Sequence, residues 1–213
     1  MIIAIDGPAA AGKGTLAKRL AVKLGYAYLD TGALYRAVAL TLLRAGQDPT
    51  DEAAAAMASD ALDLAIIEDP ELRSEATGSA ASVVAAMPTV RANLLNLQRK
   101  YAVSPPNGES GVVLDGRDIG TVVCPKADVK LYVTASPEER ARRRTAEMEA
   151  RGMTANFDTI LADVEARDER DMNRADAPLK PAKDALLLDT TILDIDAVFL
   201  RAVQIVEAQA TSG

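Results

Sequence analysis

The chain has 213 residues, a formal net charge of −7 and 49% apolar residues. This apolar content excludes an intrinsically disordered chain, and the length predicts one domain with excursions rather than two independent domains. The acidic balance argues against a general affinity for nucleic acid polymers. No apolar run approaches the roughly 18 residues of a membrane span, so we expect no membrane insertion.

Cysteine and histidine usage narrows the chemistry. The single Cys124 cannot form an internal disulfide, and no secretory signature is recognisable, which together predict a cytoplasmic protein. Cys124 follows two valines, so we expect it to pack in the core rather than to act as a reactive thiol. The chain contains no histidine, which removes the commonest general base and the commonest zinc ligand.

The N-terminal residues combine a strand, a glycine-bounded loop and a helix. Residues 2–6 are mostly apolar and predict a strand buried on both faces. Leu16, Leu20 and Leu24 recur every fourth residue and predict a helix that Gly25 ends. Between strand and helix lies a loop whose nine residues are Gly7, Pro8, Ala9, Ala10, Ala11, Gly12, Lys13, Gly14 and Thr15.

This loop has the pattern of a site for ATP with Mg²⁺. Gly7 and Gly12 allow successive backbone N–H groups to point into one concavity at a helix N-terminus, where an anion is favoured. Lys13 adds a charge for the β- and γ-phosphates, and the Thr15 hydroxyl can reach the metal ion. Lys13 is followed by Gly14 rather than by serine or threonine, a variant similar to that of nucleoside and nucleotide kinases. The alternative is a plain surface turn, which the strand–loop–lysine–helix order disfavours.

Strands and helices alternate along the rest of the chain. Further strands are predicted at residues 26–30, 111–115, 129–133 and 185–189. Helices are predicted at 33–45, at 51–64, at 79–101 with a break at Pro88, from the capping box at Ser136 onwards, and at 195–208. Residues 65–78 are predicted to form a loop, with one short strand at residues 64–67. The pattern is typical of an α/β fold with a doubly wound, five-stranded parallel sheet that binds ligands at the strand C-termini.

Arginine is concentrated in one segment. Residues 136–174 contain eight arginines, no lysine and ten acidic residues. The segment is nearly neutral but rich in fork-shaped donors, which suits a small phosphate-bearing ligand better than a polymer.

Four stretches, taken with the loop, resemble the bacterial cytidylate kinase family. They are residues 30–36, 80–91, 115–123 and 167–174, and the resemblance covers nearly the whole chain. It implies one P-loop kinase domain. Its parts are a core (1–30, 104–143 and 168–213), an insert that binds the nucleoside monophosphate (31–103) and a mobile lid (144–167). Residues 65–78 are too few for the longer β-hairpin region usual in the family, so we expect a trimmed hairpin.

The resemblance implies transfer of the γ-phosphoryl group of ATP to CMP or dCMP, giving CDP or dCDP, by a monomer. The acceptor phosphate is already ionised at pH 7, so no general base is needed. The catalytic residues implied by the resemblance are Lys13, Arg117, Arg174 and Arg144. The implied CMP-binding residues are Thr31, Arg36, Ser82, Arg91, Arg117, Asp118, Arg167, Asp171 and Arg174.

The resemblance also assigns a role to each part of this set. The acceptor phosphate is clamped by Arg36, Arg117 and Arg174. The cytosine base is contacted by Ser82, Arg91 and Asp118. The ribose hydroxyls are held by Arg167 and Asp171. Donor-side charge is stabilised from the lid by Arg140, Arg143, Arg144 or Arg151. For any single arginine, an ordinary surface ion pair remains the alternative.

Three other functions compete with this one. Another P-loop small-molecule kinase would phosphorylate UMP, a nucleoside or dephospho-coenzyme A. A guanine-nucleotide switch protein would need an Asn-Lys-x-Asp motif, and residues 173–176 lack the lysine. A non-catalytic nucleotide-binding module is disfavoured by the density of arginine after the fourth strand.

We expect Lys13→Ala to lower the turnover rate by about two powers of ten or more without unfolding the protein. The substitution removes a charge that is needed most in the transition state. Steady-state kinetics, with circular dichroism as the folding control, measure the effect. Near-normal turnover in a folded variant would contradict the phosphate-loop assignment.

Overall fold

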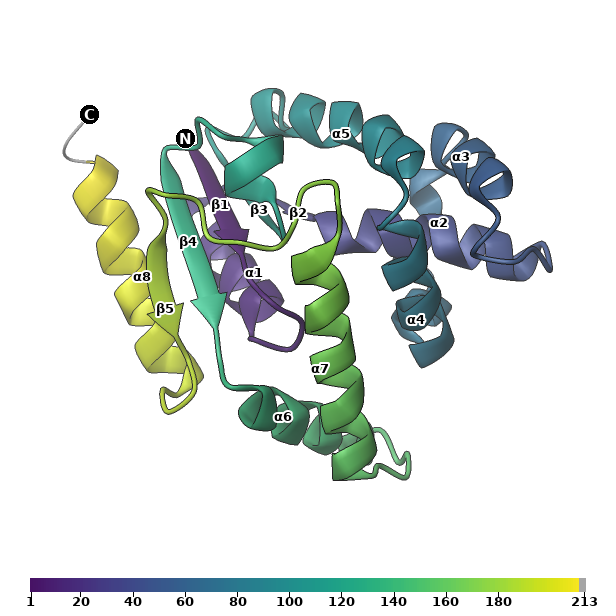
Figure 1. The fold of residues 1–213 in the computed structure, drawn as a ribbon. Coiled ribbons are helices and arrows are strands. Elements are labelled where there is room, and N and C mark those ends of the chain that lie inside the picture. The colour runs from purple at the N-terminus through teal and green to yellow at the C-terminus, as the bar shows by residue number, and fades with distance from the viewer. Residues whose placement is uncertain (211–213) are drawn as a thin grey trace. The chain divides into compact units, whose positions relative to one another are not determined.

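A computed structural model describes residues 1–210 and contains a five-stranded sheet in the order β2-β3-β1-β4-β5 (Figure 1). The strands are β1 (Ile2–Asp6), β2 (Ala27–Asp30), β3 (Val112–Gly116), β4 (Val129–Thr134) and β5 (Leu186–Asp189). The pairs β1–β3, β1–β4 and β4–β5 are parallel. The predicted doubly wound α/β fold with five parallel strands is confirmed.

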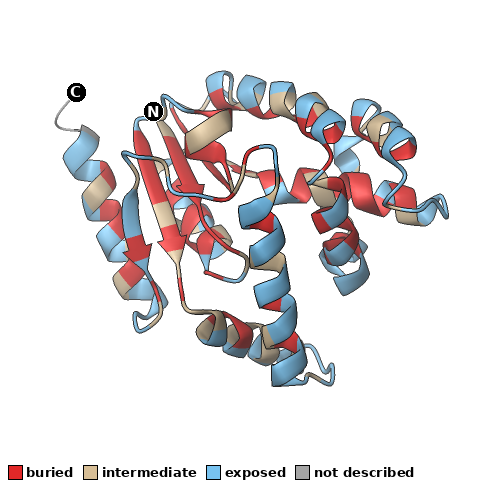
Figure 2. Ribbon diagram, viewed as in Figure 1, coloured by how far each residue is buried: buried red, intermediate tan, exposed pale blue. Residues whose placement is uncertain are grey.

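The register of the central strands decides where the site forms. Asp6, the last residue of β1, pairs with Gly116 at the end of β3 and with Tyr132 on β4. The segments that leave β1, β3 and β4 therefore emerge along one edge of the sheet, where ligands bind in parallel α/β folds. β1, β3 and β4 are buried along most of their length, whereas β5 at the edge is largely exposed (Figure 2).

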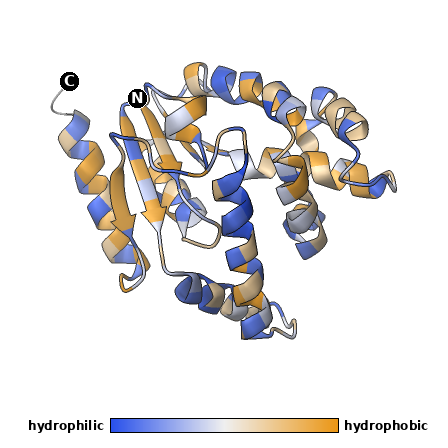
Figure 3. Ribbon diagram, in the orientation of Figure 1, coloured by the Kyte–Doolittle hydropathy of each residue, from blue (hydrophilic) through white to orange (hydrophobic). Residues whose placement is uncertain are grey.

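The chain forms two compact units, residues 1–28 with 105–213, and residues 29–104. In the first unit, α1 (Lys13–Leu24) and α8 (Ile195–Ala210) pack with the sheet in one hydrophobic cluster, to which Ile5, Leu20 and Val198 belong. The helices α6 (Pro137–Ala150) and α7 (Phe157–Asn173) form a hairpin. Much of α7 is hydrophilic (Figure 3).

The second unit is helical apart from the end of β2. Its helices are α2 (Thr31–Arg44), α3 (Glu52–Asp60), α4 (Glu75–Val84) and α5 (Pro88–Val103), with 3₁₀ turns at η1 (Leu64–Glu68) and η2 (Pro70–Arg73). Helices α2, α3 and α4 begin at side-chain caps, namely Asp30, Asp51 and Ser74. Leu34, Val38, Val84 and Leu94 lie in the hydrophobic core of this unit. None of the helices within residues 1–210 has the length and apolarity needed to cross a bilayer.

Two sequence predictions for residues 64–78 are wrong. The short strand at 64–67 is a 3₁₀ helix, and the loop predicted to 78 contains η2 and the start of α4. Local capping explains the difference, because the carboxylates of Asp63 and Asp69 accept the N–H groups of Ala65 and Glu71. The predicted helix break at Pro88 is confirmed, since α4 ends before it and α5 begins at it. The prediction that Cys124 is buried is also confirmed.

Gly7→Ala tests how closely the loop after β1 is packed. Gly7 has φ +147°, and an added Cβ would lie 1.9 Å from the carbonyl oxygen of Val133. We expect a loss of about 3 kcal/mol or more in the free energy of unfolding, measured by urea denaturation. The matched control is Gly46→Ala, at φ +66° with nothing within 4 Å of an added Cβ, which should cost only about 1 kcal/mol of backbone strain. Equal losses in the two variants would show that the contact with Val133 carries no strain.

Candidate active site

The loop between β1 and α1 exposes a helix N-terminus with no internal acceptor. Gly12, the N-cap of α1, is left-handed (φ 87°) and gives no side-chain hydrogen bond, and the first turn has no acidic residue. Ala10 also has a positive φ, 59°, so the loop is tightly coiled. The first N–H groups of α1 and the helix dipole therefore favour an anion at this point.

Lys13 is buried beside this N-terminus. The residue is 7% exposed, and its Nζ donates to the carbonyl oxygen of Pro8 at 2.7 Å. Burial, followed by the charge of Arg117, lowers the pKa of Lys13 from 10.5 to about 7, against the opposing pull of Asp115 and Asp6. A phosphate group in the loop would supply the negative charge that the buried ammonium lacks.

Asp6 fixes the segment that follows β3. Its carboxylate accepts the N–H groups of Ile119 and Gly120, each at 2.7 Å, in the π-helical turn Ile119–Val123. Burial raises the pKa of Asp6 to about 6, although these two hydrogen bonds lower it. Asp6 is not among the predicted site residues, and the signal for it in the sequence is an acidic residue that closes an otherwise apolar strand.

Five of the predicted CMP-binding residues lie in the first unit, close to one another. Arg117 donates from Nε to Asp171 Oδ2 at 2.8 Å. The desolvation of this buried pair opposes both charges, yet their attraction prevails: the pKa of Arg117 is raised and that of Asp171 is lowered. Arg174 Nη2 lies 3.9 Å from Asp118 Oδ1, and Arg167 acts electrostatically on Asp171.

The other four predicted CMP-binding residues lie in the second unit. Thr31 is buried at the start of α2, and Ser82 is buried on α4. Arg36 donates from Nη1 to the carbonyl oxygen of Leu72 at 3.1 Å. Arg91 on α5 is buried, and its Nη1 donates to the carbonyl oxygen of Ala85 at 3.3 Å.

Gly78 makes room for the guanidinium group of Arg36. A Cβ added at Gly78 would lie 3.0 Å from Nη1 and 3.1 Å from Nη2 of Arg36. Leu72 belongs to η2, a 3₁₀ turn that the sequence did not predict. This turn therefore helps to hold Arg36, which is predicted to bind the acceptor phosphate.

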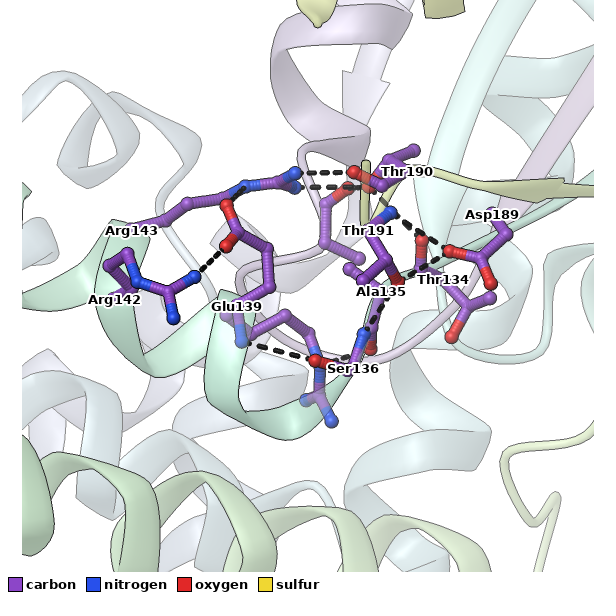
Figure 4. A network of polar contacts seen from close by, with 11 residues as sticks. Thr134, Ala135, Ser136, Glu139, Arg142, Arg143, Asp189, Thr190 and Thr191 are labelled. Carbon is purple, nitrogen blue, oxygen red and sulfur yellow. Dashed lines mark hydrogen bonds and ion pairs between the residues drawn. The ribbon is translucent and has the colours of Figure 1, made fainter. Parts of the chain in front are cut away.

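The arginines of α6 lie in two different environments. Arg143 donates to the Thr190 carbonyl and, from Nη1, to the Thr190 hydroxyl at 3.0 Å (Figure 4). It also lies near the loop, 4.0 Å from the position of a Cβ added at Gly12. Arg144 and Arg151 instead pair with Glu147 on the helix surface. Arg140 is buried and donates to carbonyl groups and a carboxylate of the first unit.

Comparison with known proteins gives consistent matches along the chain. Residues 3–208 match the family model described as cytidylate kinase. The cytidylate kinase of Rhodopseudomonas palustris CGA009 is 58% identical over 208 residues, which cover 98% of this chain and 96% of that protein. The cytidylate kinase of Paramagnetospirillum magneticum AMB-1 is 58% identical over 205 residues, which cover 96% and 97% of the two chains.

Solved structures give a likeness of fold. Shikimate kinase from Bacteroides thetaiotaomicron matches with a TM-score of 0.50 and 15% identity, over 97% of this chain and 98% of that chain. At this identity the match concerns the fold alone.

The pKa of Lys13 makes nucleotide affinity depend on pH. In the free protein Lys13 loses its charge above pH 7, whereas bound phosphates favour the charged form. Binding should therefore take up a proton, and ADP affinity should fall as pH rises from 7.5 to 9, by up to about tenfold per unit. Calorimetry in buffers of different ionisation enthalpy measures both effects. The chain has no histidine whose titration could overlap with that of Lys13.

Lys13→Met is the control for this titration. It should bind ADP more weakly, and with little pH dependence between 7.5 and 9, because the titrating group is gone. An unchanged affinity for ADP in the wild type across this range would contradict a depressed pKa at Lys13.

Proposed function

The chain belongs to the cytidylate kinase family, and we propose that it transfers the γ-phosphoryl group of ATP to CMP and dCMP, giving CDP, dCDP and ADP. The observation that carries the proposal is the buried charge cluster around the loop lysine. Arg117 and Arg167, on the acceptor side, both act electrostatically on Lys13. A site with this much adjacent positive charge is suited to two phosphate-bearing ligands at once.

The transfer needs charge neutralisation and alignment rather than proton abstraction. The acceptor oxygen of CMP is already ionised, so the barrier is set by bringing two anionic groups together in line. Lys13 stabilises the donor phosphates from the loop. Arg117 and Arg174 stabilise the acceptor phosphate. In the free protein Asp171 compensates Arg117, which keeps the guanidinium group in place.

For base and sugar recognition, the proposal follows the residue roles that the family resemblance implies. Asp118, buried and next to Arg174, is a suitable acceptor for the exocyclic amine of cytosine. Ser82 and Arg91 of the second unit supply donors for the other base atoms. Arg167 and Asp171 hold the ribose, and Arg36 contributes to the acceptor phosphate.

Mg²⁺ is the metal ion that fits this donor set. Thr15 is exposed in the first turn of α1, and the Asp115 carboxylate lies against the same turn, with Oδ2 3.3 Å from a Cβ added at Gly14. Hard oxygen donors of this kind suit Mg²⁺. Among residues 1–210 no group of three or more acidic, cysteine or histidine side chains could hold an ion unaided, so nucleotide oxygens would complete the coordination. The bound ion would neutralise phosphate charge.

The remaining assignments concern the lid and the setting of the enzyme. The proposed lid, residues 144–167, covers the end of α6, the connection and the start of α7. Arg143, Arg144 and Arg151 are the candidates for donor-side charge stabilisation. We infer a cytoplasmic, monomeric enzyme whose partners are its small-molecule substrates.

A coupled assay of ATP consumption tests the proposed reaction directly. The panel contains CMP, dCMP, UMP, cytidine and dephospho-coenzyme A. The proposal expects CMP and dCMP to be the best acceptors. Preference for UMP, for a nucleoside or for dephospho-coenzyme A would replace it with another small-molecule kinase.

Asp118→Ala tests base recognition. Cytosine presents an amine where uracil presents a carbonyl, so a carboxylate accepts from the first and repels the second. Loss of such a contact costs about 1–3 kcal/mol, so kcat/KM for CMP should fall by roughly ten- to a hundredfold, and that for UMP much less. The exposed Asp163→Ala on α7 is the control and should leave both unchanged. Equal losses for CMP and UMP would mean that Asp118 does not contact the base.

A further inference from the structure

Arg140 connects three segments of the first unit. Its side chain is 3% exposed. Nε donates to the carbonyl oxygen of Ala135 at 2.9 Å, and Nη1 donates to that of Ala9 at 3.3 Å. Nη1 also donates to Asp168 Oδ1 at 3.0 Å, while Nη2 pairs with Asp168 Oδ2. The turn before α6, the nucleotide loop and α7 therefore meet at one guanidinium group.

Asp168 lies on α7 among residues proposed to bind the acceptor. It follows Arg167 directly, and Asp171 is three residues further on, which places Asp168 and Asp171 on neighbouring positions of the helix surface. Asp171 is held by Arg117 from the segment after β3. The two ion pairs together fix both the rotation of α7 and its height along its axis. A shift of α7 would carry Arg167 and Asp171 with it.

The contact with Ala9 reaches the anion-binding part of the loop. Every peptide bond in residues 1–210 is trans, so the N–H of Ala10 points away from the Ala9 carbonyl and hence away from Arg140. Ala10 has φ 59°, and the orientation of this peptide is a defining feature of the coiled loop. Arg140 thus binds the carbonyl oxygen of the peptide between Ala9 and Ala10, and the N–H of that peptide points in the opposite direction.

Stability alone is a weak explanation for this buried pair. Taking a charged pair out of water costs about as much as its attraction returns, so such pairs add little to folding stability but impose a defined geometry. The hairpin of α6 and α7 has its own hydrophobic cluster around Ala141, Ile160 and Val164. Its two helices pack together through that cluster, whereas Arg140 and Asp168 connect the hairpin to the loop.

We propose that Arg140 and Asp168 are positioning residues for phosphoryl transfer. They hold α7 in register with the Ala9 carbonyl, so that filling the loop with the donor nucleotide also orders Arg167 and Asp171 on the acceptor side. This inference rests on the proposed function for its kinetic consequences, but the mechanical link between loop and α7 can be tested without the acceptor.

The kinetic test uses Arg140→Lys, Asp168→Asn and the double variant. Lysine keeps the charge but cannot form the forked contact, and asparagine keeps the shape. We expect kcat to fall by about ten- to a hundredfold in each single variant, with ADP affinity within about threefold of the wild type. The kcat of the double variant should be no lower than that of the more impaired single variant, because both substitutions break the same link. The matched control is Arg142→Lys, at an exposed position on the same helix, which should behave as wild type.

The second test follows the link itself by amide hydrogen exchange with and without ADP. In the wild type and in Arg142→Lys, ADP should slow exchange in residues 157–173 as well as in the loop. In Arg140→Lys and Asp168→Asn, ADP should still protect residues 7–15 but no longer 157–173. ADP protection of α7 that persists in both folded variants, or a wild-type kcat in both, would overturn the inference. A wild type that does not phosphorylate CMP would instead refute the proposed function, and the exchange experiment would still decide the role of Arg140.

Discussion

The buried ammonium group of Lys13 sets the electrostatic condition that the rest of the first unit has to satisfy. A buried charge is tolerated only when opposite charges or hydrogen bonds surround it. Burial, followed by the charge of Arg117, lowers the pKa of Lys13 to about 7, against the opposing attraction of Asp115 and Asp6. The free protein therefore stabilises the charged form of Lys13 poorly, and phosphate groups are the ligands that would supply the missing attraction.

Two buried carboxylates of this unit have different structural roles. Asp6 accepts two backbone N–H groups and fixes the π-helical turn, whereas Asp171 accepts from Arg117 and fixes a guanidinium group. Burial raises the pKa of Asp6, whereas pairing with Arg117 lowers the pKa of Asp171. One carboxylate thus organises the backbone, and the other keeps an arginine in place when no ligand neutralises it.

Arginine has two uses in this protein that composition cannot separate. The concentration of arginines after the fourth strand suggests phosphate binding for all of them. In the structure, Arg140 donates to backbone carbonyl groups and to Asp168, while Arg143 donates to the hydroxyl and carbonyl groups of Thr190. Arg144 and Arg151 remain on the helix surface with Glu147. A fork of five donors serves equally well to cross-link a scaffold and to bind a phosphate.

The sequence by itself determined the features that depend on local order along the chain. Apolar runs gave the five strands, glycine positions gave the loop and the end of α1 at Gly25, and Pro88 gave the break before α5. The family resemblance then supplied the candidate residues. Tertiary structure alone decided which of these lie together, because a contact such as that of Arg117 with Asp171 joins residues 54 positions apart. It also decided the role of Asp6, whose partners follow a different strand, and the 3₁₀ turns of residues 64–73, where capping by Asp63 and Asp69 outweighed the strand propensity of the apolar residues.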